Sequence, residues 1–144
     1  MIELSESQLD LLLRRALAVR QMAYAPYSQF PVGAAILTAT EDIFVGCNIE
    51  NASFSLTLCA ERAAATAALS AGQRQWLAIT VASQGGVTPC GACRQFLAEF
   101  GCDLWVLCVD VETQAVRRFQ LSTLLPDAFG SPALPLISKS SDVR

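Results

Sequence analysis

The stretch that decides the fold is residues 76–101, WLAITVASQGGVTPCGACRQFLAEFG. The apolar run from Trp76 to Ser83 predicts a buried strand, and the glycines within residues 84–87 predict a loop. Thr88 suits the N-cap of a helix and Pro89 suits its first position, so a helix is expected directly after the loop. A strand, a short loop and a helix form the first half of a strand–helix–strand unit.

The rest of the chain alternates helices and strands in a similar way. Residues 5–8, Ser-Glu-Ser-Gln, have the spacing of a capping box, and residues 40–42 separate two apolar runs as in a β-hairpin. The expected elements are a helix from about Glu6 to Met22, strands at Val32–Thr38 and Ile43–Cys47, an alanine-rich helix from about Leu58 to Ser70 that stops at Gly72, the helix after Pro89 to about Phe100, closed by Gly101, and strands at Leu104–Val109 and Val116–Leu121. This order predicts an α/β fold with a mixed sheet of about five strands and helices on both faces.

Length and composition suit one domain. The protein has 144 residues and a mass of 15.4 kDa, so residues 1–144 are expected to form a single domain with a polar tail from about 131 to 144. An apolar fraction of 53% and a mean hydropathy of +0.41 are high for a small soluble protein and lead to the hypothesis of an oligomer. Pro, Gly and polar residues interrupt the uncharged runs, and the acidic start lacks the layout of a secretory signal. A cytoplasmic protein is therefore expected.

Two residue counts exclude whole classes of chemistry. The chain has no histidine, which excludes an imidazole general base and histidine metal ligands. The single lysine, Lys139, lies in the polar tail, where a buried Schiff base is not expected. The net charge of −3 and the pI near 4.8 weigh against a nucleic-acid partner and favour a small, uncharged or weakly charged substrate.

Three of the six cysteines predict a zinc site. An even number of cysteines fits three disulfides, but disulfides need an oxidising compartment, so reduced thiols or thiolate ligands are favoured. Cys59 lies at the start of one expected helix, and Cys90 and Cys93 lie at the start of the next. Three thiolates from two helix N-termini can bind one tetrahedral Zn²⁺ and leave its fourth position open, as in catalytic zinc sites.

Other interpretations of these cysteines stay open. A lone C-x-x-C also occurs in redox pairs and in structural zinc knuckles. The remaining thiols, Cys47, Cys102 and Cys108, are interpreted as ordinary core or near-surface residues. Any one of them as a fourth ligand would close the zinc site and exclude catalysis there.

Two charged residues that follow Cys59 fit a catalytic zinc centre. Three thiolates give the Zn²⁺ site a formal charge of −1, so Arg62 is expected to hydrogen-bond the thiolates and partly restore the Lewis acidity of the metal. Glu61 is expected to shuttle a proton from the attacking water to the leaving group. The alternative role for Glu61 is that of a carboxylate that only stabilises the helix start.

Five segments together carry a family resemblance. They are YSQFPVGAA at 27–35, GCNIENAS at 46–53, CAER at 59–62, PCGACRQ at 89–95, and LLP at 124–126 with Phe129. From the first helix to about Phe129 the chain resembles the small homotetrameric zinc-dependent cytidine deaminases, whose wider class carries Cys or His before x-Glu and then Pro-Cys-x-x-Cys. Thr88 and Phe54 depart from that pattern, where Ser and often Tyr are expected, and neither touches the expected chemistry.

The resemblance implies the architecture and the metal centre. It implies a three-layer α-β-α sandwich, one Zn²⁺ per subunit bound by Cys59, Cys90 and Cys93, and Glu61 as the general acid/base. The subunits are implied to form a homotetramer whose active sites are shared between neighbours.

The resemblance also implies how the substrate is bound. The implied substrate-binding residues are Phe30 at the base, Asn48 and Glu50 at the ribose hydroxyl, Ala60, and Phe129 from a neighbouring subunit. Asn48 and Glu50 are two apart on an extended segment, so both side chains point the same way and offer a donor and an acceptor. Without the other motifs these two residues would be interpreted as an Asx turn and a solvated acid, and Phe129 as an aromatic that packs on its own subunit.

The implied function is the hydrolytic deamination of cytidine and deoxycytidine to uridine and deoxyuridine plus ammonia, as in pyrimidine salvage. The implied partner is a small nucleoside, with neither nucleic acid nor membrane. Two alternatives stay open: a deaminase of a related aminopyrimidine nucleoside such as blasticidin S, and a non-catalytic module stabilised by zinc.

Overall fold

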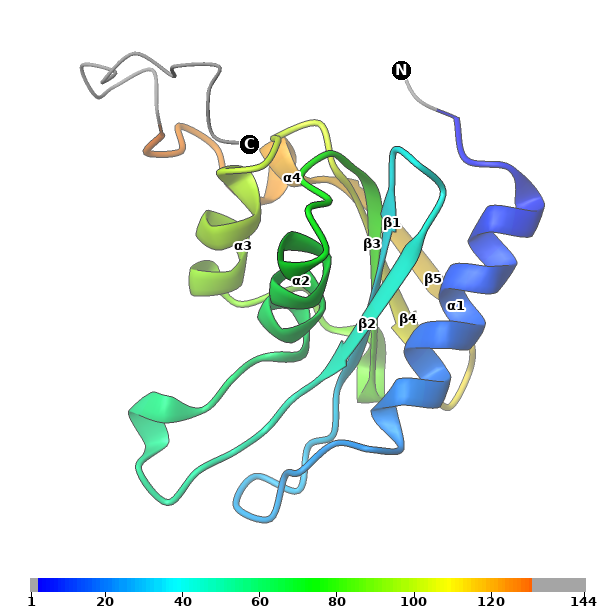
Figure 1. The fold of residues 1–144 in the computed structure, drawn as a ribbon. Helices are drawn as coiled ribbons and strands as arrows, with labels where there is room; N and C mark the ends of the chain where they lie inside the picture. Colours follow the sequence, from blue (N-terminus) through cyan, green and yellow to red (C-terminus); the bar gives the residue numbers. More distant parts are fainter. Residues whose placement is uncertain (1–2, 131–144) are drawn as a thin grey trace.

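A five-stranded mixed sheet lies between two layers of helices in the computed structural model, which describes residues 3–130 (Figure 1). The strand order is β2-β1-β3-β4-β5; β3 and β4 are parallel, and all other neighbours are antiparallel. The elements are α1 (Glu6–Arg20), β1 (Gly33–Thr38), β2 (Ile43–Cys47), η1 (Phe54–Leu56), α2 (Ala60–Ser70), β3 (Trp76–Ser83), η2 (Gln84–Gly86), α3 (Gly91–Ala98), β4 (Trp105–Asp110), β5 (Val116–Gln120) and α4 (Leu121–Leu124). The predicted α/β class, three layers and five strands are confirmed.

Each face of the sheet has its own core because side chains alternate along a strand. In Figure 1, α1 covers one face, while α2 and α3 cover the other. The core under α1 consists of Leu12, Ala16, Ala35, Leu37, Ala78, Ala82, Leu107 and Val109. The core under α2, α3 and α4 includes Ala34, Ile36, Ala64, Ala68, Ile79, Val81, Leu97, Val106, Cys108 and Leu121.

The first helix begins as predicted and ends slightly early. The Gln8 backbone N–H donates to the Ser5 hydroxyl at 3.2 Å, and the Ser5 N–H donates to the Gln8 side chain at 2.9 Å, which completes the capping box. The helix ends at Arg20, not Met22. The N–H of Met22 donates to Val19 at i−3, so the last turn is tighter than an α-helical turn.

Both helices that carry cysteines start later than expected. Leu58 lies outside α2 because it exchanges two backbone hydrogen bonds with Ile49, each 2.9 Å long. The predicted N-cap Thr88 and first helical residue Pro89 also lie outside α3, whose N-cap is Cys90. The Thr88 hydroxyl and the Pro89 carbonyl instead accept hydrogen bonds from the Arg94 side chain. A contact from a residue further along the chain therefore overrides the local capping signal.

Helix α3 also ends slightly earlier than the predicted end at about Phe100. The helix ends at Ala98, and Phe100 follows it with an i−3 hydrogen bond to Leu97. The expected polar tail at 131–144, with Lys139, lies outside the described residues. None of the helices within residues 3–130 is both long and apolar enough to cross a membrane.

Candidate metal and catalytic site

Two helix N-termini bring three thiols together. Cys59 is the N-cap of α2, Cys90 is the N-cap of α3, and Cys93 lies in the first turn of α3. The three Sγ atoms lie within 4.8 Å of one another. The side chains of Cys59 and Cys90 do not cap their own helices, so both thiols remain free to bind a ligand. The positive ends of both helix dipoles favour thiolate at this place.

The thiol cluster fits a zinc ion. At about 2.3 Å per Zn–S bond, tetrahedral sulfur ligands lie about 3.8 Å apart, so only small adjustments separate the observed cluster from that geometry. Within residues 3–130 the cluster contains these three thiols and none of Cys47, Cys102 and Cys108. Of those three, Cys108 is buried in the sheet core, and burial raises its pKa to about 11. The arrangement therefore leaves the fourth zinc position open, as a catalytic site requires.

Arg62 contacts the cluster as the sequence predicts. Its Nη2 atom lies 3.5 Å from the Cys59 Sγ atom and 3.5 Å from the Thr57 carbonyl oxygen. A hydrogen bond from the Cys93 thiol, assisted by the hydrogen bond and charge of Arg62, lowers the pKa of Cys59 to about 5 despite burial. The same pairing, together with burial, raises the pKa of Cys93. The cluster thus holds at least one thiolate at neutral pH before any metal is considered.

Glu61 is a buried carboxyl group beside the cluster. It is 5% exposed, and burial, opposed in part by its hydrogen bond to the backbone, raises its pKa to about 7. Glu61 lines a cavity of about 280 Å³ together with Cys59 and Cys90. A carboxyl group with a pKa near neutrality can both donate and accept a proton, which is the property that general acid/base catalysis needs.

Three of the predicted substrate-binding residues line the same cavity: Phe30, Asn48 and Ala60. The Asn48 side chain uses half of its hydrogen-bonding capacity on the backbone: its Oδ1 atom accepts from the Val32 N–H and its Nδ2 atom donates to the Phe30 carbonyl, both at 2.9 Å. These bonds leave Asn48 one further N–H and one lone pair for a ligand. They also fix the strand-like segment that carries Phe30.

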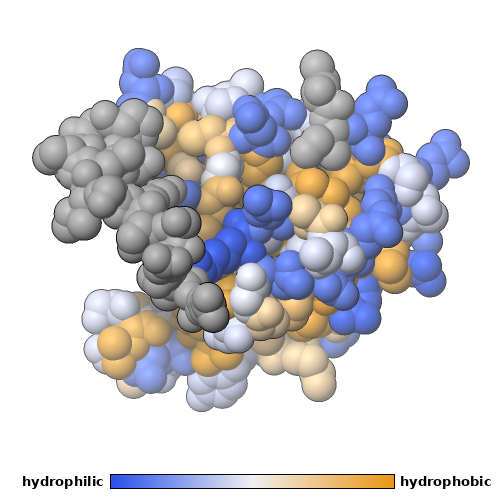
Figure 2. All heavy atoms as spheres, turned by 45° about the horizontal axis from the view of Figure 1, so that its top comes forward, coloured by the Kyte–Doolittle hydropathy of each residue, from blue (hydrophilic) through white to orange (hydrophobic). Residues whose placement is uncertain are grey.

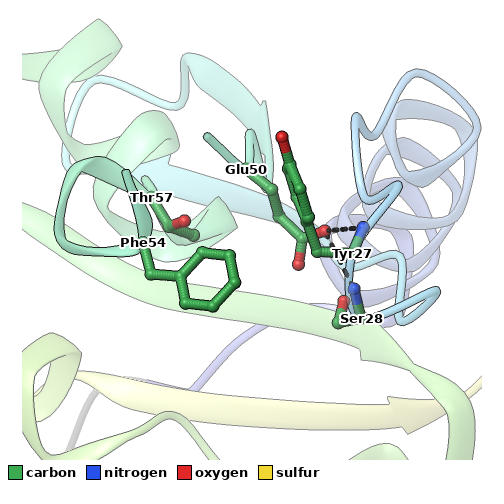
Figure 3. A pocket seen from close by; sticks show the side chains of 5 residues that line it. All are labelled: Tyr27, Ser28, Glu50, Phe54 and Thr57. Atoms are coloured by element: carbon green, nitrogen blue, oxygen red, sulfur yellow. Dashed lines mark hydrogen bonds between the residues drawn. The ribbon is translucent and has the colours of Figure 1, made fainter. Parts of the chain in front are cut away.

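Glu50 lines a second, adjoining cavity (Figure 3). This cavity measures about 420 Å³ and shares Ser28 and Thr57 with the first. The Oε1 atom of Glu50 accepts from the backbone N–H groups of Tyr27 at 2.9 Å and Ser28 at 3.1 Å. The Ser28 hydroxyl and these N–H groups lower the pKa of Glu50, so the carboxylate is ionised at neutral pH. A common contact of Asn48 and Glu50 with one sugar stays a prediction.

Phe129 lies apart from both cavities of its own chain. Its side chain is 62% exposed, and its carbonyl oxygen accepts from the Gln95 side chain at 2.9 Å. The structure does not bring it to Glu61 within one subunit, since it is not among the residues that line either cavity. Its predicted role therefore requires a second chain.

Several cavity residues had no assigned role in the sequence analysis. The cavity that contains Glu61 is also lined by Ser28, Val32, Thr57, Val81, Val87 and Thr88. Ser28, Val32 and Thr88 were noted only as parts of motifs or as an expected cap. No local sequence pattern indicates that Thr57, Val81 and Val87 line a cavity, because only the packing of β3 and the loops shows which way their side chains face.

Three clustered thiols, an adjacent arginine and a buried carboxyl group beside a cavity define a candidate zinc centre of the catalytic kind. Comparisons with known proteins agree with this interpretation of the site. The model of the cytidine and deoxycytidylate deaminase zinc-binding region matches residues 6–109. The chain therefore belongs to the cytidine and deoxycytidylate deaminase family.

Curated relatives and solved structures cover most of the chain. A cytidine deaminase of Sporosarcina psychrophila is 44% identical over 131 residues, which cover 85% of this chain and 92% of the relative. A probable cytidine deaminase of Dictyostelium discoideum is 43% identical over 136 residues, covering 91% of this chain and 90% of the relative. The crystal structure of cytidine deaminase from Burkholderia pseudomallei has a TM-score of 0.81 at 44% identity and covers 88% of this chain and all of that one.

Proposed function

We propose that the protein hydrolytically deaminates cytidine and deoxycytidine to uridine and deoxyuridine with release of ammonia. The observation that carries the proposal is the buried Glu61 beside the Cys59, Cys90 and Cys93 cluster, at a cavity large enough to admit a pyrimidine base. The relatives named cytidine deaminase, which match most of the chain at 43–44% identity, support it.

The reaction adds water to C4 of the base and breaks the bond from C4 to the exocyclic nitrogen. Zinc on the three thiolates supplies the Lewis acidity that makes water nucleophilic near neutral pH. Glu61 accepts a proton from the attacking water and donates it to N3 of the base; it then accepts the proton of the hydroxyl formed on C4 and delivers it to the amino nitrogen, which leaves as ammonia while C4 becomes a carbonyl. Arg62 donates to the Cys59 sulfur and withdraws electron density from the thiolates, which keeps the metal centre acidic.

The two adjoining cavities suit the two halves of a nucleoside. Phe30 and Ala60 line the cavity that contains Glu61 and would contact the base. Asn48 and Glu50 would hydrogen-bond the sugar, with Glu50 as an acceptor-only carboxylate that favours a hydroxyl donor. A cavity that positions C4 near the cluster lowers the barrier by fixing the orientation of the base.

The active unit is proposed to be a homotetramer whose active sites are shared between subunits. Large apolar side chains are exposed on the single chain, including Met22, Tyr24, Tyr27, Phe54, Leu56 and Phe129. Figure 2 shows hydrophobic surface between hydrophilic residues on the face that it presents. Stacking of Phe129 on the base of a neighbouring subunit would add about 1–3 kcal/mol to binding, the scale of base–aromatic stacking.

Subunit complementation tests the shared site. The variants Glu61→Ala and Phe129→Ala are unfolded and refolded together, so that mixed oligomers form. Some sites then combine an intact Glu61 from one chain with an intact Phe129 from another, and activity exceeds the sum of the parents. Mixed oligomers with only the averaged parental activity would show that Phe129 serves its own subunit.

Residues 1–144 act as one deaminase domain, with one Zn²⁺ per subunit. The protein works in the cytoplasm in pyrimidine salvage, on small nucleosides and without nucleic-acid or membrane partners. The negative net charge and the absence of a membrane-spanning helix among the described residues are consistent with this.

The activity is tested by following the ultraviolet absorbance of cytidine with purified, zinc-loaded protein. Cytidine and deoxycytidine are expected to be consumed, and blasticidin S is compared under the same conditions. The isosteric variant Glu61→Gln is expected to keep zinc and fold but to lose about 10²–10⁴-fold in kcat, the contribution of general acid/base catalysis. Bound zinc without turnover in the parent protein would support the non-catalytic module instead.

A further inference from the structure

Helix α3 carries three consecutive residues that reach three different parts of the molecule. Cys93 is buried in the thiol cluster. Arg94 contacts Leu124 at the end of α4, and Gln95 contacts Phe129 in the chain that follows α4, which passes beside α3 in Figure 1. The two polar side chains therefore connect α3, which carries Cys93 of the thiol cluster, to residues about 30 positions further along the chain.

All three guanidinium nitrogens of Arg94 donate hydrogen bonds. Nε donates to the Pro89 carbonyl at 2.7 Å, Nη2 donates to the Thr88 hydroxyl at 2.8 Å, and Nη1 donates to the Leu124 carbonyl at 2.7 Å. The first two contacts fix the loop directly before Cys90, and the third fixes the end of α4. A planar fork can reach three separate acceptors at once, whereas a lysine ammonium on a flexible stem cannot.

Gln95 forms the second connection. Its Nε2 atom donates to the Phe129 carbonyl at 2.9 Å. The acceptors on Leu124 and Phe129 thus lie at the two ends of residues 124–129. Between them Asp127 has a φ of 50°, a left-handed conformation that a non-glycine residue keeps when its surroundings determine it.

We propose that Arg94 and Gln95 are positioning residues that fix segment 124–129 to α3 and thereby fix where Phe129 is presented to the base of a bound nucleoside. This inference rests on the proposed function, in which Phe129 contacts the substrate. Phe129 is 62% exposed on the single chain, so the place of its ring depends in large part on its backbone. One helix thereby sets both the metal ligand Cys93 and the aromatic that faces a neighbouring site.

The experiment compares Gln95→Glu with a matched control, Gln75→Glu. The first change keeps the size of the side chain but removes the donor to Phe129. The control introduces the same charge at an exposed residue next to β3. Hydrogen exchange of residues 124–129 is measured on the zinc-loaded protein without substrate, together with zinc content and the KM and kcat for cytidine.

Gln95→Glu is expected to accelerate exchange in residues 124–129 and to raise KM about two- to tenfold, the factor that one hydrogen bond supplies. Zinc content and kcat are expected to stay within twofold of the parent, and the control is expected to change neither exchange nor KM. Arg94→Lys is expected to accelerate the same exchange, because the single ammonium nitrogen cannot reach all three acceptors that the three guanidinium nitrogens contact. Unchanged exchange in both variants would overturn the proposal whatever the activity.

A double mutant separates this proposal from the proposed function. If Gln95 acts through Phe129, Gln95→Glu adds nothing to the KM of Phe129→Ala, so the two effects are not additive. If the KM increases of the two single variants multiply in the double mutant, the positioning role of Gln95 is overturned. A parent protein that does not deaminate cytidine would overturn the proposed function, while the exchange measurement would still decide whether the connection to α3 exists.

Discussion

Gly46 lies where α2 comes closest to the sheet, and Gly46→Ala is expected to displace the catalytic helix. A Cβ at this position would lie 2.3 Å from the Ala64 backbone nitrogen and 2.6 Å from the Ala63 Cβ. The first distance is 1.1 Å short of ordinary contact at 3.4 Å. The obstructing atom is helix backbone, which cannot rotate away as a side chain can. Helix α2 must therefore move by about 1 Å, at a cost of about 1–3 kcal/mol in the free energy of unfolding.

That displacement reaches the proposed active site because Cys59 and Glu61 lie at the start of α2. Metal–ligand distances tolerate about 0.2 Å, so a shift of about 1 Å between Cys59 and the cysteines of α3 weakens zinc binding. A misplacement of about 1 Å also costs about 10²-fold in rate. We therefore expect Gly46→Ala to lose about 10²-fold in kcat for cytidine and to need more zinc for full occupancy.

Gly33→Ala provides the matched control. A Cβ there would lie 2.2 Å from the Ala16 carbonyl oxygen of α1, in the opposite helix layer. Its thermal unfolding is expected to shift as much as that of Gly46→Ala, while its kcat stays within about threefold of the parent, since the displaced helix carries no catalytic residue. Calorimetry, a zinc titration and the absorbance assay measure the three quantities. A Gly46→Ala protein with parental kcat and zinc affinity would refute the reasoning.

Three further outcomes are expected. Arg62→Ala removes the donor to the Cys59 sulfur, so turnover falls by about tenfold or more, some zinc remains, and the pH–rate profile moves to higher pH; an unshifted profile would contradict the role of Arg62. Asp110 accepts from the Gly85 N–H and the Thr113 hydroxyl, which lower its pKa, so its contribution to stability is present at neutral pH and lost as the pH falls below about 4. Asp110→Asn should therefore flatten the loss of stability in acid unfolding, and equal slopes in both proteins would argue against this. A thiol-competent zinc chelator should lower both the unfolding temperature and the activity, and added Zn²⁺ should restore both.

Local patterns in the sequence predicted most of the fold. The capping box at Ser5 predicted the start of α1, and the turn at residues 40–42 predicted the β1–β2 pair. The alternation of helices and strands after this hairpin predicted the parallel β3–β4 pair. These features depend on near neighbours in the chain or on hydrophobic period, both of which the sequence shows directly. The motif spacing likewise predicted that Cys59, Cys90 and Cys93 would meet.

The hydrogen-bond partners of single polar side chains could not be predicted. Thr88 and Pro89 have the local character of a helix start, but Arg94 takes their oxygen atoms and the helix begins after Cys90. The pattern around Asn48 did not indicate that half of its hydrogen-bonding capacity goes to backbone groups of Phe30 and Val32, and its contact with a sugar stays a prediction. The hydrogen-bond partner of a polar side chain depends on which groups lie near it in the folded protein. The type of the side chain alone allows many partners.

The face of α2 against the sheet consists of alanines, namely Ala60, Ala64, Ala65 and Ala68, all with no exposed surface. Alanine has no rotatable side-chain torsion, so this contact cannot accommodate new volume by changing rotamers. A larger side chain there is therefore expected to move the helix, and Cys59 and Glu61 with it, as well as to lower stability. The α1 layer, with Leu12, Leu37 and Leu107 in its core, can exchange one aliphatic shape for another at similar volume. Substitutions that raise thermal stability without changing the zinc site are therefore expected more readily on the α1 side of the sheet.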